Sequence, residues 1–433
     1  MVGAHNAFVI ETLTFQALEN LAYAYTLTAD ERYAAKAAVI LDAIAAIYPS
    51  AHRGCWDYPS KPQSGRLNRP WYQASRGLVH YVDHYDQLYS SKSMDEPSVV
   101  SGLTRRANIE NSLLRDGGAY CYDQSKAGRL HNGEADYQRG ALAAGLALEI
   151  PEYVRWAVDG PAGIRAMLEN NLDRDGAYYE TTPLYSDHTR ELYFTFAEAL
   201  LDCRIEPYPA GLNLYQYPQL KRFFSPYNLM LFGAGHAVRY GDAQPEVEKR
   251  VAGRPFNRSD YDFLEKLFAR TGDPVTGSLL GWMAGGKFDE LRGLRSSGDP
   301  SGTTIPDRRT QAGMSLYRDP GDAWGGGFTE RAWMLFHAGD PPSDARLPDE
   351  WRRRLLESHV LGNKGFALLR SGQGAAAQAV AMRYGPALTH SHFNALNLNY
   401  IARGYELTYD LGYGYSSATQ GARAQMSGLT SGR

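Results

Sequence analysis

The chain has 433 residues, of which 43% are hydrophobic and 21% are charged, so it has enough apolar sequence to build two or three folded domains. Its formal net charge of −3 excludes the extended basic field that drives nucleic-acid binding. It contains no run of about 18 apolar residues, and its opening residues lack the charged and apolar segments of a secretion signal. We therefore expect no nucleic-acid partner, no membrane span and no signal peptide in this chain.

Most of the sequence is predicted to be helical, because apolar residues recur at helical spacing and polar residues often precede the stretches they form. The predicted helices cover residues 11–25, 28–48, 72–89, 135–148, 153–172, 187–203, 261–271 and 332–337. Short loops join several neighbours into antiparallel hairpins. Repeated hairpins of this kind predict a toroid or solenoid of helix pairs over residues 1–345.

The pattern of apolar residues changes near residue 345, from helical spacing to short alternating runs. Short alternating runs punctuated by glycine predict antiparallel strands over 365–370, 377–384, 396–402 and 405–409, with a hairpin turn at Arg403-Gly404. Four or five strands do not readily close a sandwich, and an unpaired edge strand is a liability. We therefore expect residues 346–433 to be the start of a β-domain that is truncated at the C-terminus.

Three segments gather polar and titratable residues where turns meet regular elements. The first, residues 130–137, reads LHNGEADY and leads into an apolar helix. Asn132 or Asp136 at this point is either a helix cap or a functional group.

The second segment, residues 173–180, reads DRDGAYYE and is followed by PLYSDH at 183–188. The Asp-Gly turn ends one helix, and Ser186 or Asp187 is placed to start the next. Tyr185 then lies beside a helix N-terminus, whose partial positive charge favours a phenolate by up to about 1 kcal/mol. A free tyrosine has a pKa of about 10, so a basic role also needs a nearby cation or several hydrogen bonds. Packing is the alternative role.

The third segment, residues 384–396, reads YGPALTHSHFNAL and precedes YDLGY at 409–413. If a strand begins by His390, the two-residue period of a strand turns His390, His392 and Asn394 to one side. Two histidines and an acid are ligands that a divalent metal accepts, although this spacing alone supports a metal only weakly.

Together the three segments resemble the heparinase II/III-type polysaccharide lyases, a group that includes alginate lyase and heparinase-like proteins. That family carries an H-G-H-x-D-A-L strand, a glycine turn and a D-x-G, which residues 390–396 and Asp410 to Gly412 resemble in order and spacing. Its D-G-x-x-x-E followed by tyrosine is similar to residues 175–185, and its asparagine at the start of a helix is similar to Asn132. The resemblance runs from the opening helices to about Tyr415 and implies an incomplete (α/α) toroid followed by an antiparallel β-sandwich.

The resemblance also implies an activity, which is β-elimination on an acidic polysaccharide that contains uronic acid. By position, Asn132 would neutralise the uronate carboxylate, and Tyr185 and His390 would be the acid–base pair. Such chemistry needs the carboxylate charge neutralised and an acid and a base within hydrogen-bond reach of the ring. Substrate contacts would come from His131, Tyr178 and His188. The family further implies a secreted or periplasmic protein.

The chain departs from the family pattern at several positions. Gly133 follows Asn132 where several members have histidine or an aromatic residue, Ser391 replaces glycine, and Asn394 replaces aspartate. The lyase reaction requires no cofactor. His392 and Asp410 would belong to a structural divalent metal site, zinc or calcium, and this site looks incomplete because no histidine follows His392.

Two other functions fit the same sequence. A toroid glycoside hydrolase would use paired carboxylates, for example Asp136 with Asp175 or Glu180, as its acid and base. A non-catalytic glycan-binding protein would keep an aromatic cleft without the chemistry. Only elimination leaves a conjugated double bond that absorbs ultraviolet light, so the product distinguishes a lyase from a hydrolase.

Overall fold

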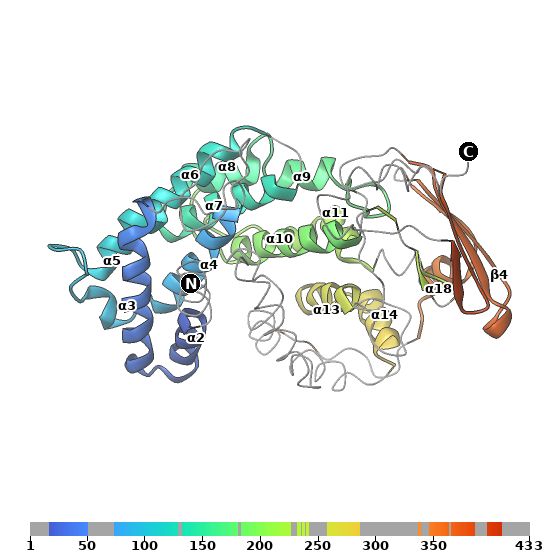
Figure 1. The fold of residues 1–433 in the computed structure, drawn as a ribbon, viewed down its shortest axis with the longest axis horizontal. Coiled ribbons are helices and arrows are strands. Elements are labelled where there is room, and N and C mark those ends of the chain that lie inside the picture. The colour runs from blue at the N-terminus through green and yellow to red at the C-terminus, as the bar shows by residue number, and fades with distance from the viewer. Residues whose placement is uncertain are drawn as a thin grey trace, which may run out of the picture. The chain divides into compact units, whose positions relative to one another are not determined.

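The computed structural model is mostly helical, with a small antiparallel sheet toward the C-terminal end (Figure 1). It describes residues 17–50, 73–128, 132–180, 183–226, 232–234, 236–238, 240–241, 258–285, 337, 339, 346–362, 365–385 and 396–408. The chain divides into two compact units. Unit 1 comprises residues 1–166, 198–212 and 298–328, and unit 2 comprises residues 167–197, 213–297 and 329–433. Unit 2 thus combines helices with the sheet, and a division into a toroid and a sandwich domain at residue 345 stays a prediction.

The helices of unit 1 largely follow the apolar periodicity of the sequence. They are α2 (Leu18–Thr28), α3 (Glu31–Ile47), α4 (Gln73–Leu88), α5 (Arg105–Asn108), α6 (Asp116–Ser125), α7 (Asn132–Ala147) and α8 (Pro151–Asp159), with a π-helical turn η4 (Ile109–Arg115) and short 3-10 turns η2 (Tyr48–Ser50) and η3 (Lys92–Asp95). Asp30 caps α3, as its polar side chain before an apolar stretch suggests, by accepting a hydrogen bond from the Arg32 N–H. The helices over 105–125 were not predicted.

The single helix predicted over residues 153–172 is wrong, because α8 and α9 (Ile164–Asn170) form two helices there. Gly160 leaves the helical conformation with φ −60° and ψ 164°, and its N–H donates to the Trp156 carbonyl that closes α8. Pro161 follows and has no N–H with which to continue the ladder.

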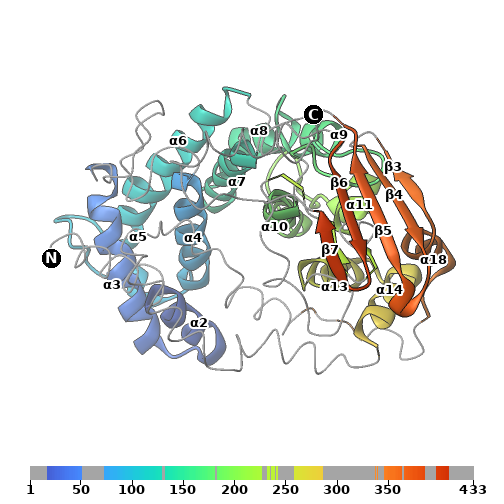
Figure 2. The same cartoon turned by 45° about the vertical axis from the view of Figure 1, so that its right-hand side comes forward.

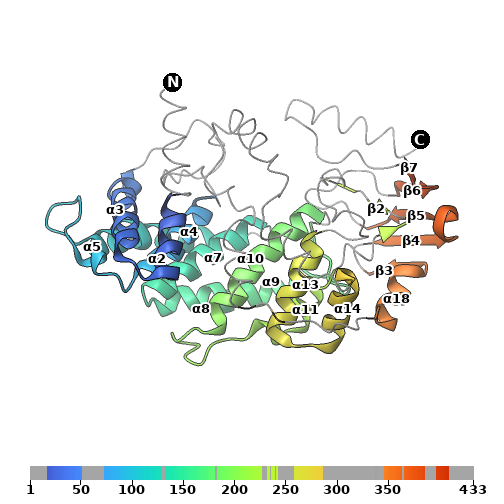
Figure 3. The ribbon, with the colours of Figure 1, turned by 90° about the horizontal axis from the view of Figure 1, so that it is seen from below.

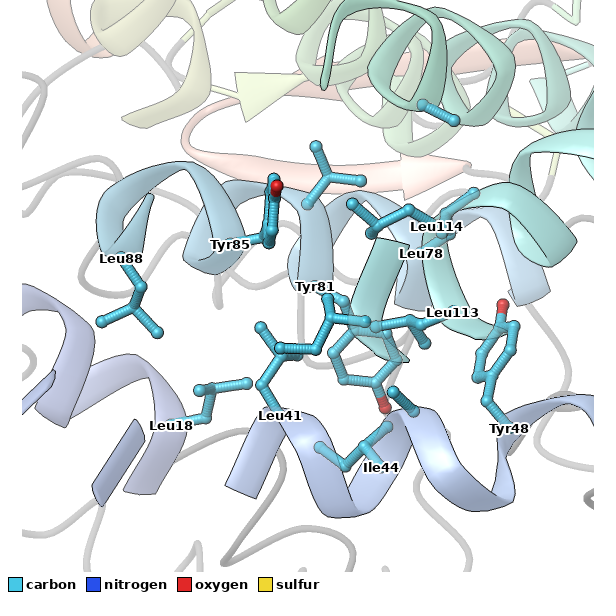
Figure 4. Packing of buried hydrophobic residues seen from close by; sticks show 14 of the residues in the cluster. Leu18, Leu41, Ile44, Tyr48, Leu78, Tyr81, Tyr85, Leu88, Leu113 and Leu114 are labelled. Carbon is cyan, nitrogen blue, oxygen red and sulfur yellow. The ribbon is translucent and has the colours of Figure 1, made fainter. Parts of the chain in front are cut away.

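The core of unit 1 is a continuous apolar cluster between α2, α3, α4 and the segment 109–121 (Figure 4). Leu41, Leu78 and Leu113 are fully buried at its centre. One carboxylate is buried with them: Asp42 accepts hydrogen bonds from Ser98 Oγ at 2.7 Å, the Val99 N–H at 2.8 Å and Asn108 Nδ2 at 2.8 Å. A buried carboxylate is tolerated only when it is hydrogen-bonded. These bonds therefore hold α3 against residues 98–108.

Residues Glu31–Ser50, which include α3, are the one described stretch long and apolar enough by length and composition to cross a membrane. A core helix of the same length passes this test equally well. Ala34, Ala38 and Leu41 on α3 are fully buried within the apolar cluster. Core packing accounts for its apolar character, and the stretch is weak evidence for a membrane span.

Unit 1 also buries a histidine whose titration is expected to affect stability. His84 lies on α4 with its ring 4.4 Å from that of His80 and 6.2 Å from that of Tyr23, and burial lowers its pKa to about 4. Between that value and the ordinary pKa of about 6.5, the unfolded chain binds a proton that the folded chain does not. Folding is therefore destabilised as the pH falls through this window.

We expect the His84→Phe substitution to remove this pH dependence. Relative to the variant, the parent protein should lose up to about 1.4 kcal/mol of unfolding free energy per pH unit between about pH 6.5 and pH 4. Urea unfolding at several pH values measures the difference between the two proteins. Parallel pH profiles would contradict the prediction.

Unit 2 contains the remaining described helices and the main sheet. Its helices are α10 (Pro183–Leu201), which ends in unit 1, α11 (Pro218–Phe224), α13 (Arg258–Thr271), α14 (Pro274–Ala284) and α18 (Asp349–Leu356), with 3-10 turns η5 (Leu214–Gln216) and η8 (Gly374–Ala376). Figure 3 shows α13 beside both α11 and α14. Asp273 caps α14 and Pro274 follows as its first residue, a common start for a helix. The helix predicted over 332–337 lies mostly outside the described residues.

The sheet of unit 2 has five antiparallel strands in chain order: β3 (His359–Leu361), β4 (Phe366–Ser371), β5 (Gln378–Arg383), β6 (Leu398–Ala402) and β7 (Tyr405–Thr408) (Figure 2). Four of these were predicted, and the short strand β3 was not. The turn at Arg403-Gly404 is confirmed: both residues have positive φ, 53° and 79°, and Ala402 pairs with Tyr405. A bulge between Tyr400 and Ile401 shifts the pairing by one residue from the simple hairpin register.

A second, two-stranded sheet lies against the first. Its strands β1 (Phe232–Gly233) and β2 (His236–Ala237) form a short hairpin. A Cβ atom built on Gly233 would lie 2.5 Å from the Ala379 methyl group, so this close approach needs glycine. His236 Nε2 also lies 3.0 Å from the Gly404 carbonyl oxygen. The described residues thus form helices and a small antiparallel sheet. A complete (α/α) toroid and a β-sandwich stay predictions.

Candidate functional site

Tyr185 lies in the first turn of α10, which begins at Pro183 and thus four residues before the predicted start at Asp187. The helix begins at Pro183, whose fixed φ and missing N–H suit the first helical position. The Tyr185 side chain is half-buried, as are those of Asp187 and His188. The phenol therefore sits beside a helix N-terminus, with its partial positive charge, and is partly open to solvent.

The first two turns of α10 are fixed by a buried arginine. Arg190 Nη1 lies 3.1 Å from Asp187 Oδ1 and 3.0 Å from Asp260 Oδ1 on α13. The same guanidinium donates to the carbonyl oxygens of Phe223, at 2.8 Å, and Ser225, at 3.2 Å. One side chain thus connects α10 to α13 and to the end of α11. Because the Arg190 side chain is only 1% exposed, these bonds form in a low-dielectric interior and rigidly position the turn that carries Tyr185.

The Asp-Gly segment before α10 forms a tight, internally bonded loop. Asp173 Oδ1 accepts hydrogen bonds from the N–H groups of Asp175 and Ala177, both at 2.9 Å. Asp175 in turn accepts from the Gly362 N–H at 2.6 Å, which ties the loop to the end of β3. Gly176 has φ +89°, which side chains rarely adopt, and its ideal Cβ position lies 2.4 Å from the Arg222 carbonyl oxygen. The turn of the D-G motif therefore closes directly onto the end of α11.

The Gly176→Ala substitution should be strongly destabilising, because it adds a steric clash with a backbone atom to an unfavourable φ. We expect a loss of about 2–4 kcal/mol in unfolding free energy. Gly272→Ala is the matched control, since Gly272 also has positive φ, +61°, but has nothing within 4 Å of its Cβ position. The control should lose only about 1 kcal/mol. Equal losses for the two variants in urea unfolding would disprove the close-approach argument.

Tyr178 is placed in the interior by the structure. Its side chain is 1% exposed, and its ring lies 4.8 Å from that of Tyr179 and 6.1 Å from that of Phe223. Burial, followed by the charge of Glu180, raises the pKa of Tyr178 well above its ordinary value. These surroundings favour a packing role for Tyr178 over the predicted substrate contact. Tyr179, its half-buried neighbour, has a pKa raised by the same two causes.

Tyr240 is a buried residue that packs against the sheet of unit 2 and that the sequence reasoning missed. The Tyr240 ring lies 4.4 Å from that of Phe366 on β4. Burial raises the pKa of Tyr240, and the positive charge of Arg383 on β5 opposes that rise. Asp187 and Arg190 also act on it electrostatically. No local sequence motif marks Tyr240, because tertiary packing alone brings these groups together.

In unit 1, Asn132 is the first residue of α7, which agrees with the prediction that it begins a helix. Asp136, one turn later, does not cap the helix. It is fully buried, and its carboxylate lies 3.0 Å from Arg76 Nη2 on α4 and 3.1 Å from Arg139 Nη2. Asp136 therefore connects α7 to α4 through a buried ion pair.

Two of the carboxylates in the hydrolase hypothesis, Asp136 and Asp175, have other partners in the structure. Asp136 is ion-paired with two arginines, and Asp175 accepts the Gly362 N–H. Asp136 belongs to unit 1, whereas Asp175 and Glu180 belong to unit 2. A hydrolytic acid–base pair needs two carboxyl groups available to the substrate, so these contacts do not favour the hydrolase.

Several predicted site residues fall outside the described part of the chain: His131, His390, His392 and Asp410. Among the residues that the structure does describe, no group of three or more histidine, cysteine, aspartate or glutamate side chains is arranged to hold a metal ion. The predicted zinc or calcium site therefore stays a prediction. Asn132 lies in unit 1 and Tyr185 in unit 2, so their convergence with His390 is a prediction as well.

No known family model matches the sequence, and no curated protein matches it. Among solved structures, the chain is similar to a heparan sulfate lyase from Pedobacter heparinus, with 14% identity, 94% of this chain and 50% of that chain covered, and a TM-score of 0.48. It is also similar to a structure of heparinase III, with 10% identity, 96% and 52% coverage, and a TM-score of 0.49. The chain therefore spans about half the length of these structures. Identity this low does not say which site residues are shared.

Proposed function

We propose that the chain belongs to a polysaccharide lyase that cleaves an acidic, uronic-acid-containing polysaccharide by β-elimination. The observation that carries the proposal is Tyr185, a partly exposed phenol in the first turn of a helix that Arg190 locks to two other elements. Such pre-organisation is what an acid–base residue needs, because small misplacements are costly to the reaction. The three motifs, in the order typical of heparinase II/III-type lyases, supply the reaction class.

The proposed chemistry assigns one task to each residue of this chain. The amide of Asn132 neutralises the uronate carboxylate, so that the C5 proton becomes more acidic. Of Tyr185 and His390, one removes that proton and the other protonates the C4 oxygen as it leaves. His131 and His188 are proposed substrate contacts. His392 and Asp410 are proposed ligands of a structural metal, which takes no part in these steps.

The helix N-terminus supports either task for Tyr185. If Tyr185 is the base, the partial positive charge of the first turn stabilises the phenolate it needs. If Tyr185 is the acid, the same charge stabilises the phenolate that remains after the phenol has protonated the leaving C4 oxygen, and the phenolate is protonated again before the next turnover. The proposal further includes a secreted or periplasmic location, because extracellular polysaccharides are reached there.

A substrate screen tests the reaction class directly. The protein is incubated with alginate, heparan sulfate, hyaluronan and an ulvan-type polysaccharide, and the absorbance of the conjugated double bond is followed. We expect one of these to give rising ultraviolet absorbance together with new reducing ends. New reducing ends without absorbance would show hydrolysis and contradict the proposal.

A further inference from the structure

A cavity of about 250 Å³ lies within unit 2, and it is lined by the end of α11, the helices α13, α14 and α18, and the Arg174-Asp175 loop. Among the described residues proposed for the lyase reaction, neither Tyr185 nor His188 lines it. Its size is slightly below the range of about 300–1,000 Å³ that is typical of small-molecule sites. The space therefore suits a compact ligand, about the size of a single sugar ring.

The cavity has an apolar floor and a charged rim. Leu264, Leu279 and Trp351 contribute buried apolar surface. The rim carries four basic side chains, Arg174, Lys221, Arg222 and Arg354, and three carboxylates, Asp175, Asp273 and Glu350.

The carboxylates of the rim are already engaged. Asp273 accepts hydrogen bonds from the N–H and the hydroxyl of Thr276, at 2.7 and 2.6 Å, as the cap of α14. Asp175 accepts the Gly362 N–H at 2.6 Å, and Glu350 lies 2.7 Å from Arg354. These contacts hold the three carboxylates in place, and the four basic side chains outnumber them, so the rim favours a ligand with negative charge.

Two of the basic groups have no ion-pair partner within the described part of the chain. These are Lys221 and Arg222, consecutive residues in the last turn of α11, whereas Arg354 pairs with Glu350 and stacks on the Trp351 ring with its Cζ 5.4 Å from the ring centroid. The backbone of Arg222 is fixed, because its carbonyl oxygen contacts Gly176 and its neighbour Phe223 binds Arg190. The two cations therefore extend from a rigid helix end.

We infer that this cavity binds a small organic anion, in which a ring-sized body rests on the apolar floor and a carboxylate bonds to Lys221 and Arg222. Arginine and lysine give charge-assisted hydrogen bonds to carboxylates, which are about twice as strong as neutral ones. The apolar floor requires an organic body rather than a bare inorganic ion.

Hydrogen exchange with mass spectrometry tests this site, because it locates the binding. The probes are glucuronate, neutral glucose and inorganic sulfate, each at the same concentration. Glucuronate should slow exchange in α11 and in the first turns of α14 and α18, whereas glucose and sulfate should do so far less. Equal protection by glucose or by sulfate, or none by glucuronate in these helices, would overturn the assignment.

Substitutions separate this site from the proposed reaction. The double change Lys221→Gln and Arg222→Gln should weaken the glucuronate-dependent protection at least about tenfold in apparent Kd. Arg353→Gln, an exposed position on α18 that does not line the cavity, should leave it unchanged. Arg222→Gln alone, also at an exposed position, gives a second reading should the double variant unfold. Unchanged protection in the double or the single variant would refute the site.

The outcome does not depend on the lyase proposal. Tyr185→Phe should keep the protection in these three helices, because Tyr185 does not line the cavity. Loss of protection there on changing Tyr185 would place the glucuronate elsewhere and overturn the inference. Failure to cleave any polysaccharide would leave the expected protection unaffected.

Discussion

Replacing Tyr185 by Phe should lower kcat on the polysaccharide found by screening about a hundredfold to ten-thousandfold, which is the usual contribution of an acid–base group. The substitution removes only the hydroxyl. The ring can keep its half-buried position on α10, and the Arg190 contacts that fix the helix do not involve Tyr185. Substrate binding and thermal stability should therefore change little.

The measurement is the initial rate of ultraviolet absorbance, with substrate affinity determined separately. Tyr217→Phe is the matched control, because Tyr217 is also half-buried in unit 2 but lies outside the three motifs. The control should retain full turnover. If Tyr185→Phe turned over substrate as fast as the parent, Tyr185 would not be the acid or the base. If the parent bound the polysaccharide without cleaving it, a glycan-binding protein would be the better description.

Replacing Arg190 by Met should cost about 3–5 kcal/mol of unfolding free energy, the largest stability effect we expect. Asp260 is fully buried, and Asp187 is 13% exposed, so the substitution removes the Arg190 charge from beside two carboxylates in the interior. Two backbone carbonyls, of Phe223 and Ser225, lose their donor as well. Arg190→Lys should recover only part of the loss, because an ammonium group cannot reproduce the planar fork of the guanidinium.

The chain offers a matched control for this experiment. Arg352 and Asp349 on α18 also form an i,i+3 ion pair, but their side chains are 59% and 98% exposed. The distance between Arg352 Nε and Asp349 Oδ1 is 3.8 Å. Exposed pairs contribute about 0–1 kcal/mol, so Arg352→Met should be nearly neutral. Similar urea midpoints for the two methionine variants would show that Arg190 does not hold unit 2 together. Because Arg190 positions the first turns of α10, its variants should also lose turnover when Tyr185 is catalytic.

The sequence by itself determined where most regular elements lie. Apolar spacing located α3, α4, α7 and α13 to within a few residues, because a helix that buries one face must repeat at 3.6 residues. Glycine and alternating residues likewise located β4 to β7 and the Arg403-Gly404 turn, since that turn needs two residues with positive φ. It also placed Tyr185 near a helix N-terminus, although α10 begins four residues earlier than predicted. These are local properties, and a local pattern encodes them.

Only the tertiary structure decided which polar residues act together. The pairing of Asp187 with Arg190 is visible in the sequence as an i,i+3 spacing, but Asp260 lies 70 residues further along the chain. In the same way, Asp136 looked like a helix cap or a catalytic acid until its partner Arg76, 60 residues away, became known. Long-range electrostatics depends on burial and on partners that packing brings close, and neither is recorded in the neighbouring residues.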